Sequence, residues 1–219
     1  MQPLTDRLGL PRERSPRVLV LSPHADDAEI GAAGTIARLV AERPDATLTW
    51  LVLAASDVAR EQEARRSADA LLAGAASSSI DVRRLRDGFL PYEGSSAKEA
   101  LLEHGPDDPD LILGPRRDDA HQDHRLVAEL TTQVFRGATV LEYELPKWDG
   151  DLGPANVYVP LSTTTFDEKV DHLITTFPSQ HDRVWFRADT FRAIARLRGV
   201  ECRAPDGLAE AFVCRKLIV

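Results

Sequence analysis

Two strongly apolar runs constrain the fold of this chain more than any other feature. Residues 18–21 are Val-Leu-Val-Leu and lead into a loop that carries His24, Asp26 and Asp27, and residues 46–55 form a second such run. Continuous apolar runs are typical of strands that are buried on both faces of a parallel sheet. Ligands bind such sheets just beyond the carboxyl ends of the strands. The sequence therefore predicts a mostly parallel sheet, with the histidine and both carboxylates at its functional edge.

Helical patterns alternate with apolar runs through the first two thirds of the chain. Apolar residues recur at helical spacing over residues 28–42, where Gly31 and Gly34 indicate a close approach to a strand, and Pro44 stops the pattern. Alternating strands and helices require right-handed crossovers, which place helices on both faces of the sheet. The first strand is expected to start at Arg17, and further strands are expected at 46–55, 80–85, 110–114 and 139–144. Between them, the expected helices are one at 28–42, one capped by Ser56 or Asp57, one capped by Ser96 and Glu99, and one that ends near residue 135.

The alternation breaks after Pro146. The expected elements there are a glycine-rich loop at 147–154, a short strand at 156–160, a helix capped by Thr165 and Glu168, a helix at 189–198 and a strand at 210–218. The predicted fold class is therefore α/β, Rossmann-like, with a mostly parallel sheet, helices on both faces and a C-terminal α+β extension. The length of 219 residues fits one domain spanning residues 1–219. Residues 1–16 contain three prolines and are expected to form an N-terminal arm without an element.

Composition and charge narrow the classes of partner. The formal net charge of −8 argues against nonspecific binding to nucleic acid or to anionic membranes, because both depend on a basic surface. No apolar run approaches the roughly 20 residues that span a bilayer, and residues 1–16 lack the apolar centre of a signal peptide. We therefore expect a cytoplasmic protein without integral membrane contact. Cys202 and Cys214 have no metal-site spacing and are expected to be packing residues. The oligomeric state is not indicated.

A second polar cluster follows the predicted strand at 110–114. It contains His121, Asp123 and His124, and it can converge with the first cluster because the carboxyl ends of parallel strands share one edge of the sheet. Two imidazoles and one carboxylate, with positions left open for water, form a common ligand set for catalytic Zn²⁺ and for non-haem Fe²⁺. A further carboxylate beside the metal can act as a base, and another can orient an imidazole. The sequence predicts a metal-dependent enzyme.

The two clusters closely resemble the two signature motifs of the PIG-L/LmbE family of zinc-dependent N-acetylglucosaminyl deacetylases. The matching stretches are Pro23-His24-Ala25-Asp26-Asp27 and Asp119-Ala120-His121-Gln122-Asp123-His124, and the resemblance extends over about residues 17–216. It implies that His24, Asp27 and His124 are the metal ligands. It further implies that Asp26 is the general base, that His121 is the general acid or oxyanion stabiliser, and that Asp123 orients His121.

The reaction that the resemblance implies is hydrolysis of the acetamide of an N-acetylhexosamine, carried by a sugar nucleotide, a glycolipid or a small glycoside. Two positions depart from the family pattern: Ala25 replaces a proline, and Ala28 replaces a glutamate, with Glu29 next to it. We expect Ala25 to loosen a turn at little cost to the chemistry, and Ala28 to affect substrate preference rather than metal binding. Two alternatives stay open, namely a non-haem Fe(II) enzyme with the same ligands and a catalytically inactive sugar-binding protein on this scaffold.

Three further residues are candidates for substrate binding. Arg60 and Arg116 could form bidentate hydrogen bonds with a phosphate or a sugar hydroxyl, and Trp148 could stack on a sugar ring. The other residues of interest are expected to have structural or surface roles: Trp50 and Trp185 in packing, and His104 and His172 on solvated helix faces.

Overall fold

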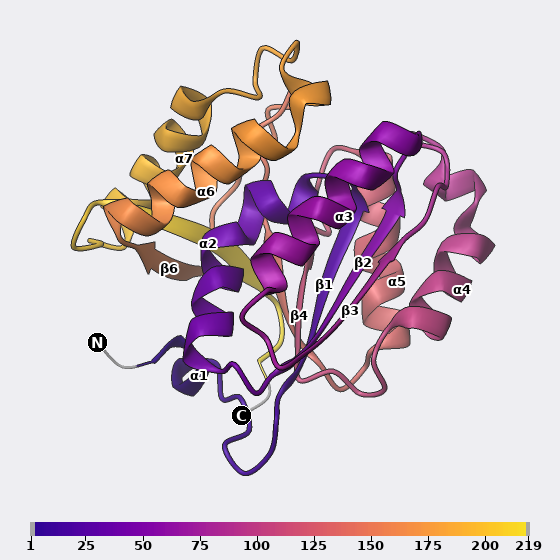
Figure 1. Cartoon of the computed structure of the whole chain (residues 1–219), viewed down its shortest axis with the longest axis horizontal. Helices are drawn as coiled ribbons and strands as arrows, with labels where there is room; N and C mark the ends of the chain where they lie inside the picture. The colour runs from indigo at the N-terminus through magenta and orange to yellow at the C-terminus, as the bar shows by residue number, and fades with distance from the viewer. Residues whose placement is uncertain (1–2, 218–219) are drawn as a thin grey trace.

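The structure, a computed structural model, describes residues 3–217 and is organised around a seven-stranded sheet (Figure 1). The strands are β1 (Arg17–His24), β2 (Thr47–Ala54), β3 (Ser77–Val82), β4 (Leu111–Pro115), β5 (Thr139–Tyr143), β6 (Val157–Leu161) and β7 (Leu208–Cys214). Their order across the sheet is β3-β2-β1-β4-β5-β7-β6. Neighbours among β1 to β5 are parallel, whereas β7 pairs antiparallel with both β5 and β6. The predicted α/β class with a C-terminal extension is confirmed.

Helices cover both faces of the sheet (Figure 1). They are α1 (Leu4–Arg7), α2 (Asp27–Glu42), α3 (Val58–Leu72), α4 (Gly94–His104), α5 (Gln122–Val134), α6 (Thr163–Thr176) and α7 (Ala188–Glu201), with 3-10 turns η1 (Leu90–Tyr92) and η2 (Pro178–Gln180). Helices α2, α3, α6 and α7 share one apolar cluster with Val18 and Val20, whereas α4 and α5 share the other with Leu19 and Leu21. Successive strand residues point to opposite faces, so the apolar run of β1 supplies both layers.

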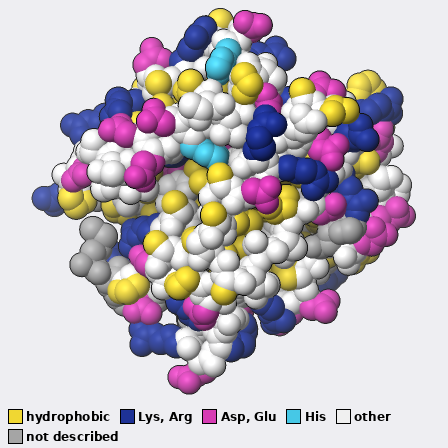
Figure 2. All heavy atoms as spheres, in the orientation of Figure 1, with side chains coloured by type: hydrophobic (Ala, Val, Ile, Leu, Met, Phe, Trp, Pro, Cys, Tyr) yellow, Lys and Arg dark blue, Asp and Glu magenta, His cyan; other side chains and the backbone are white. Residues whose placement is uncertain are grey.

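The outer surface of the α2, α3 and α6 layer is polar. Figure 2 shows acidic and basic side chains interspersed over this face. The apolar stripe of α6, formed by Phe166, Val170 and Leu173, is buried in the larger apolar cluster, where α6 packs against α2, α3 and α7. Within residues 3–217, no helix is long and apolar enough to cross a membrane.

Two glycines allow α2 to lie close to the sheet. A Cβ atom on Gly31 would lie 2.7 Å from ring atoms of Tyr143 in β5, and one on Gly34 would lie 2.7 Å from Leu161 in β6. The close helix–strand approach predicted from these glycines is confirmed. It holds the N-terminal turn of α2, which carries Asp27, against the strand ends.

We expect Gly31→Ala to lower the free energy of unfolding by about 1–3 kcal/mol, the usual cost of overpacking a core. Tyr143 cannot move aside easily, because it is 1% exposed and its hydroxyl donates to the Leu21 carbonyl at 2.8 Å. Urea unfolding measures the change. Gly94→Ala is the matched control, since its added Cβ would lie 3.9 Å from Leu126, its nearest neighbour. Equal losses in both variants would contradict this account of α2.

Some element boundaries differ from the prediction because they depend on distant contacts. Strand β3 begins at Ser77 rather than at residue 80; as an edge strand paired only with β2, it tolerates exposed serines. Helix α4 begins at Gly94, directly after η1, so Ser96 and Glu99 do not cap it. The polar residues at the starts of β3 and α4 lack the apolar pattern from which the start of an element is predicted.

Three other boundaries are informative. Ser162 caps α6 through the N–H of Thr165, so this helix begins earlier than the predicted cap. Asp57, one of the two predicted alternatives, caps α3. Strand β7 ends at Cys214, and the last residue of the strand predicted at 210–218 lies outside the described residues.

The prediction of an N-terminal arm without an element was wrong. The short helix α1 packs on the domain, with Leu4, Leu8 and Leu10 buried in the larger apolar cluster. The N–H of Thr5 also donates to Glu42 at the end of α2, at 3.1 Å. The three leucines were the signal, because their burial offsets the entropy cost of ordering the segment.

Candidate active site

A cavity of about 450 Å³ opens at the carboxyl ends of the parallel strands. Its lining includes His24 at the end of β1, Asp26 and Asp27 at the start of α2, and His121 and His124 at the start of α5. Strands β1 and β4 are parallel neighbours, so the chain segments that follow them emerge side by side. The two polar clusters therefore meet in one cavity, although His24 and His124 are 100 residues apart in the sequence.

Three side-chain atoms form a compact triangle in this cavity. His24 Nδ1 lies 3.1 Å from Asp27 Oδ2 and 3.1 Å from His124 Nε2, and the Asp27 and His124 atoms are 3.2 Å apart. Zinc–ligand bonds of about 2.0–2.2 Å place neighbouring tetrahedral ligands about 3.3 Å apart. The triangle therefore fits one divalent cation, with room for water on its open side. His121 offers a ring nitrogen within 4.8 Å of those of His24 and His124.

Each of the two histidines in the triangle has a carboxylate on its other ring nitrogen. His24 Nε2 lies 3.1 Å from Asp123 Oδ2, and His124 Nδ1 lies 2.9 Å from Asp119 Oδ2. Such outer carboxylates orient metal-binding imidazoles and fix which nitrogen faces the metal. Both contacts leave the inner nitrogen free to bind a cation, which is a second indication that the cluster is a metal site.

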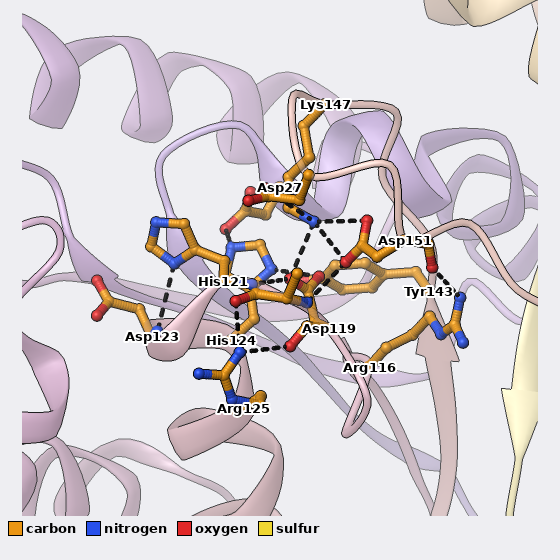
Figure 3. Close-up of polar contacts among 12 residues, drawn as sticks. Asp27, Arg116, Asp119, His121, Asp123, His124, Arg125, Tyr143, Lys147 and Asp151 are labelled. Atoms are coloured by element: carbon orange, nitrogen blue, oxygen red, sulfur yellow. Dashed lines mark hydrogen bonds and ion pairs between the residues drawn. The ribbon is translucent and has the colours of Figure 1, made fainter.

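The contacts of Asp123 differ from the prediction that it orients His121. Its carboxylate contacts His24 and accepts hydrogen bonds from the N–H groups of Gly88 and Leu90 at 2.8 and 3.1 Å. Only its backbone N–H reaches His121, at Nδ1 (Figure 3). Asp123 is fully buried, and the loop before α4 wraps its carboxylate. The sequence motif does not reveal that direction.

Asp119 is a site residue to which the sequence assigned no role. Besides His124, its carboxylate accepts from the N–H of His121 at 2.7 Å and from Lys147 Nζ at 2.9 Å (Figure 3). Burial would raise the pKa of Asp119, but the contacts with His124 and Lys147 outweigh it and keep this pKa well below its usual range. The available signal was a carboxylate within the motif, five residues before a histidine.

We expect Asp119→Asn to weaken metal affinity about 10–100-fold, the usual effect of changing an outer partner of a metal ligand. The amide keeps the shape but removes the negative charge that faces His124 and Lys147. Competition against a chromogenic chelator measures the affinity. Asp118→Asn is the control, because the Asp118 side chain is 59% exposed and paired with arginines. Equal affinities in the two variants would show that Asp119 does not support the metal site.

Asp26 has one engaged and one free carboxylate oxygen. Oδ1 accepts from Arg60 Nη2 at 2.8 Å, whereas Oδ2 is buried and has no hydrogen-bond partner among the described residues. Burial raises the pKa of Asp26, and the positive charge of Arg60 opposes this shift. A fixed carboxylate with a free oxygen at the cavity is suited to accept a proton from water.

His121 stands at the N-terminus of α5, where its Nδ1 accepts from the Asp123 N–H. Because Nδ1 is an acceptor, the neutral ring carries its proton on Nε2. Burial and the nearby rings of His124 and His24 lower the pKa of His121. The ring can therefore offer a neutral N–H donor to a developing oxyanion.

The two arginine candidates have different positions. Arg60 lines the cavity, but its guanidinium already binds Asp26, Glu63 and Ser179. It therefore holds the carboxylate of Asp26 rather than facing a ligand freely. Arg116 is not a substrate contact in this geometry: it is buried behind the loop at 147–154, with Nη1 3.3 Å from the Asp151 carbonyl.

Two of the three tryptophans line the cavity, whereas Trp50 and His172 lie elsewhere in the fold. Trp148 lines the cavity and is 67% exposed. Trp50 is fully buried and Trp185 packs against the larger apolar cluster, as predicted, although Trp185 also lines the cavity. His172 is half-buried, and its Nε2 lies 2.8 Å from Ser67 Oγ, so the prediction of a solvated side chain was wrong. The side chain of His104 lies outside the described part of the structure.

The two departures from the family pattern lie in the core. Ala25 and Ala28 are fully buried in the larger apolar cluster and do not line the cavity. Glu29 is also buried, and burial raises its pKa to about 8. Glu29 is therefore largely protonated at neutral pH and does not replace the negative charge of a glutamate at position 28.

The fold and the histidine–carboxylate cluster at the strand ends define a metal-site protein of the α/β class. The chain belongs to the PIG-L family, because the family model described as GlcNAc-PI de-N-acetylase matches residues 19–135, more than half of the chain. This family comprises metal-dependent N-deacetylases. A comparison with curated protein sequences gives no match.

Solved structures share the fold at low sequence identity. N,N'-diacetylchitobiose deacetylase from Pyrococcus horikoshii has a TM-score of 0.68 and 20% identity, covering 96% of this chain and 89% of that chain. The 4-carboxy-2-hydroxymuconate hydratase of Pseudomonas putida KT2440 has a TM-score of 0.66 and 16% identity, covering 93% and 98%. A deacetylase of teicoplanin biosynthesis, solved with teicoplanin, has a TM-score of 0.64 and 14% identity, covering 91% and 99%. These similarities concern the fold alone.

Proposed function

We propose that the protein is a Zn²⁺-dependent hydrolase that removes the acetyl group from an N-acetylhexosamine carried by a sugar nucleotide, a glycolipid or a small glycoside. The observation that carries this proposal is the triangle of His24, Asp27 and His124 atoms beside the unpartnered oxygen of Asp26 in one cavity. Membership of the PIG-L family supports the acetamide as the bond that is cleaved.

The residues divide the chemistry between them. His24, Asp27 and His124 hold the ion, which when bound polarises a carbonyl and lowers the pKa of water toward about 7. Asp26 Oδ2 accepts the proton of the water that attacks the amide carbon, while Arg60 holds Oδ1 in place. His121 Nε2 donates a hydrogen bond to the carbonyl oxygen as it becomes negative. Asp26 then returns its proton to the departing nitrogen, and acetate and the free amine leave.

Three other functions compete with the proposed deacetylase activity. The same ligand set suits non-haem Fe²⁺, and the fold is shared with a hydratase, so neither the ligands nor the fold alone determines the reaction. A catalytically inactive sugar-binding protein is disfavoured by Asp26 itself. A buried carboxylate oxygen without a partner lowers stability, so its presence in the cavity favours a catalytic role over a purely structural one.

A substrate screen coupled to metal analysis tests the proposal. The protein is loaded with Zn²⁺ or Fe²⁺ and assayed for acetate on N-acetylglucosamine, its sugar nucleotide, a glycolipid and a glycoside, with oxygen consumption followed in parallel. We expect acetate release by the zinc form without oxygen uptake. Oxygen uptake only by the iron form would favour the Fe(II) alternative, and a zinc form inert on the whole panel would exclude the sugar deacetylase.

A further inference from the structure

Two tryptophans from distant segments line the cavity that contains the triangle. Trp148 belongs to the loop after β5, and Trp185 to the segment between α6 and α7, which rises at the top of Figure 1. Trp148 is 67% exposed, whereas Trp185 packs edge-on against Phe186 with ring centroids 5.8 Å apart. Because Trp148 lines the cavity and is mostly exposed, its indole offers an apolar face to a ligand in the cavity.

The exposure of Trp148 is not a consequence of a loosely attached loop. Lys147 Nζ lies 2.9 Å from Asp119 Oδ1 and 3.0 Å from Asp151 Oδ2, so the residue before Trp148 is anchored to the carboxylate that orients His124 (Figure 3). Beyond Trp148, Asp151 Oδ2 accepts from the Ala120 N–H at 2.7 Å. Contacts on both sides of Trp148 thus connect its position to the second metal-site motif.

Polar side chains lie next to both tryptophans in the cavity lining. Asp149 follows Trp148, and Gln180 and Arg183 precede Trp185. An aromatic face flanked by hydrogen-bonding groups suits a pyranose, whose C–H face is apolar and whose edge carries hydroxyls. The acidic and imidazole groups around the triangle offer no apolar face. The tryptophan side of the cavity therefore favours a sugar ring, whereas the triangle favours the polar acetamide.

We propose that Trp148 and Trp185 form a subsite for a second pyranose, joined by a glycosidic bond to the N-acetylhexosamine whose acetamide reaches the metal site. This inference rests on the proposed function and narrows the substrate to a disaccharide or a longer glycoside. The subsite contributes binding energy outside the reacting bond, so it distinguishes a disaccharide from a monosaccharide.

The test compares N,N'-diacetylchitobiose with N-acetylglucosamine as substrates of the zinc-loaded protein. We expect kcat/KM to be about tenfold higher for the disaccharide, in line with the stacking of one ring. Trp148→Ala should remove this advantage, whereas Trp148→Phe should retain most of it. Tyr92→Ala is the matched control, because Tyr92 is an aromatic residue 77% exposed outside the cavity lining.

A binding measurement separates this inference from the proposed function. Isothermal titration calorimetry reports binding of N,N'-diacetylchitobiose to the Asp26→Asn protein, with and without Trp148→Ala. If neither sugar is hydrolysed by the wild type but the disaccharide binds only when Trp148 is present, the subsite stands and the deacetylase proposal fails. If both sugars are hydrolysed equally well, or the disaccharide binds equally without Trp148, the subsite is excluded.

Discussion

Asp26→Asn is expected to lower kcat for acetate release by about 10²–10⁴-fold, the usual contribution of a general base. The amide keeps the shape of the side chain and its contact with Arg60, but it cannot accept a proton at the atom that is free in the wild type. The protein should still bind one metal ion, because the triangle does not include Asp26. Turnover assays and metal analysis of the same sample measure both quantities.

Asp182→Asn is the control for this variant, since Asp182 is an exposed aspartate outside the cavity lining. It should leave both turnover and metal content unchanged. Loss of the metal from Asp26→Asn would show that Asp26 is a ligand. If Asp26→Asn keeps its metal and its full turnover, Asp26 is not the general base.

His124→Ala is expected to abolish stoichiometric metal binding and activity together. It removes one of three ligands, so its effect on metal affinity should exceed the about 10–100-fold loss typical of an outer partner. It also leaves the buried carboxylate of Asp119 without its histidine. Metal content after gel filtration measures the loss, and circular dichroism reports whether the fold is retained.

His172→Ala provides the comparison, because it removes a partly buried histidine that hydrogen-bonds Ser67 on α3 rather than facing the cavity. It should keep its full metal content. A His124→Ala protein that also retains one tightly bound metal ion would show that the triangle is not the metal site.

The sequence predicts the sheet well because its signal is local. The apolar run at 18–21 continues without alternation, and the polar residues that follow it stand at a strand end in the structure. The convergence of His24 with His124 follows from the parallel pairing of β1 with β4. The start of the edge strand β3 was harder to predict, because its first residues are polar and exposed and lack the apolar pattern that identifies buried strands.

The outer contacts of the site could not be predicted, because they depend on side-chain directions that only the folded chain determines. Asp123 contacts His24 and the loop at Gly88, although its neighbour in the motif is His121. Arg60 was a candidate for substrate binding, yet its guanidinium holds Asp26. Residue types thus indicated the chemistry of the site, whereas tertiary contacts determined which groups pair.

The most direct test of the central claim measures acetate and free amine together, with N,N'-diacetylchitobiose as substrate and the protein in native, chelated and zinc-reloaded forms. The account predicts that the native and reloaded forms release acetate and amine in equal amounts, and that the chelated form releases neither. Equal acetate release by the chelated protein, or none by a zinc-reloaded protein across the whole panel of acetamido sugars, would contradict it.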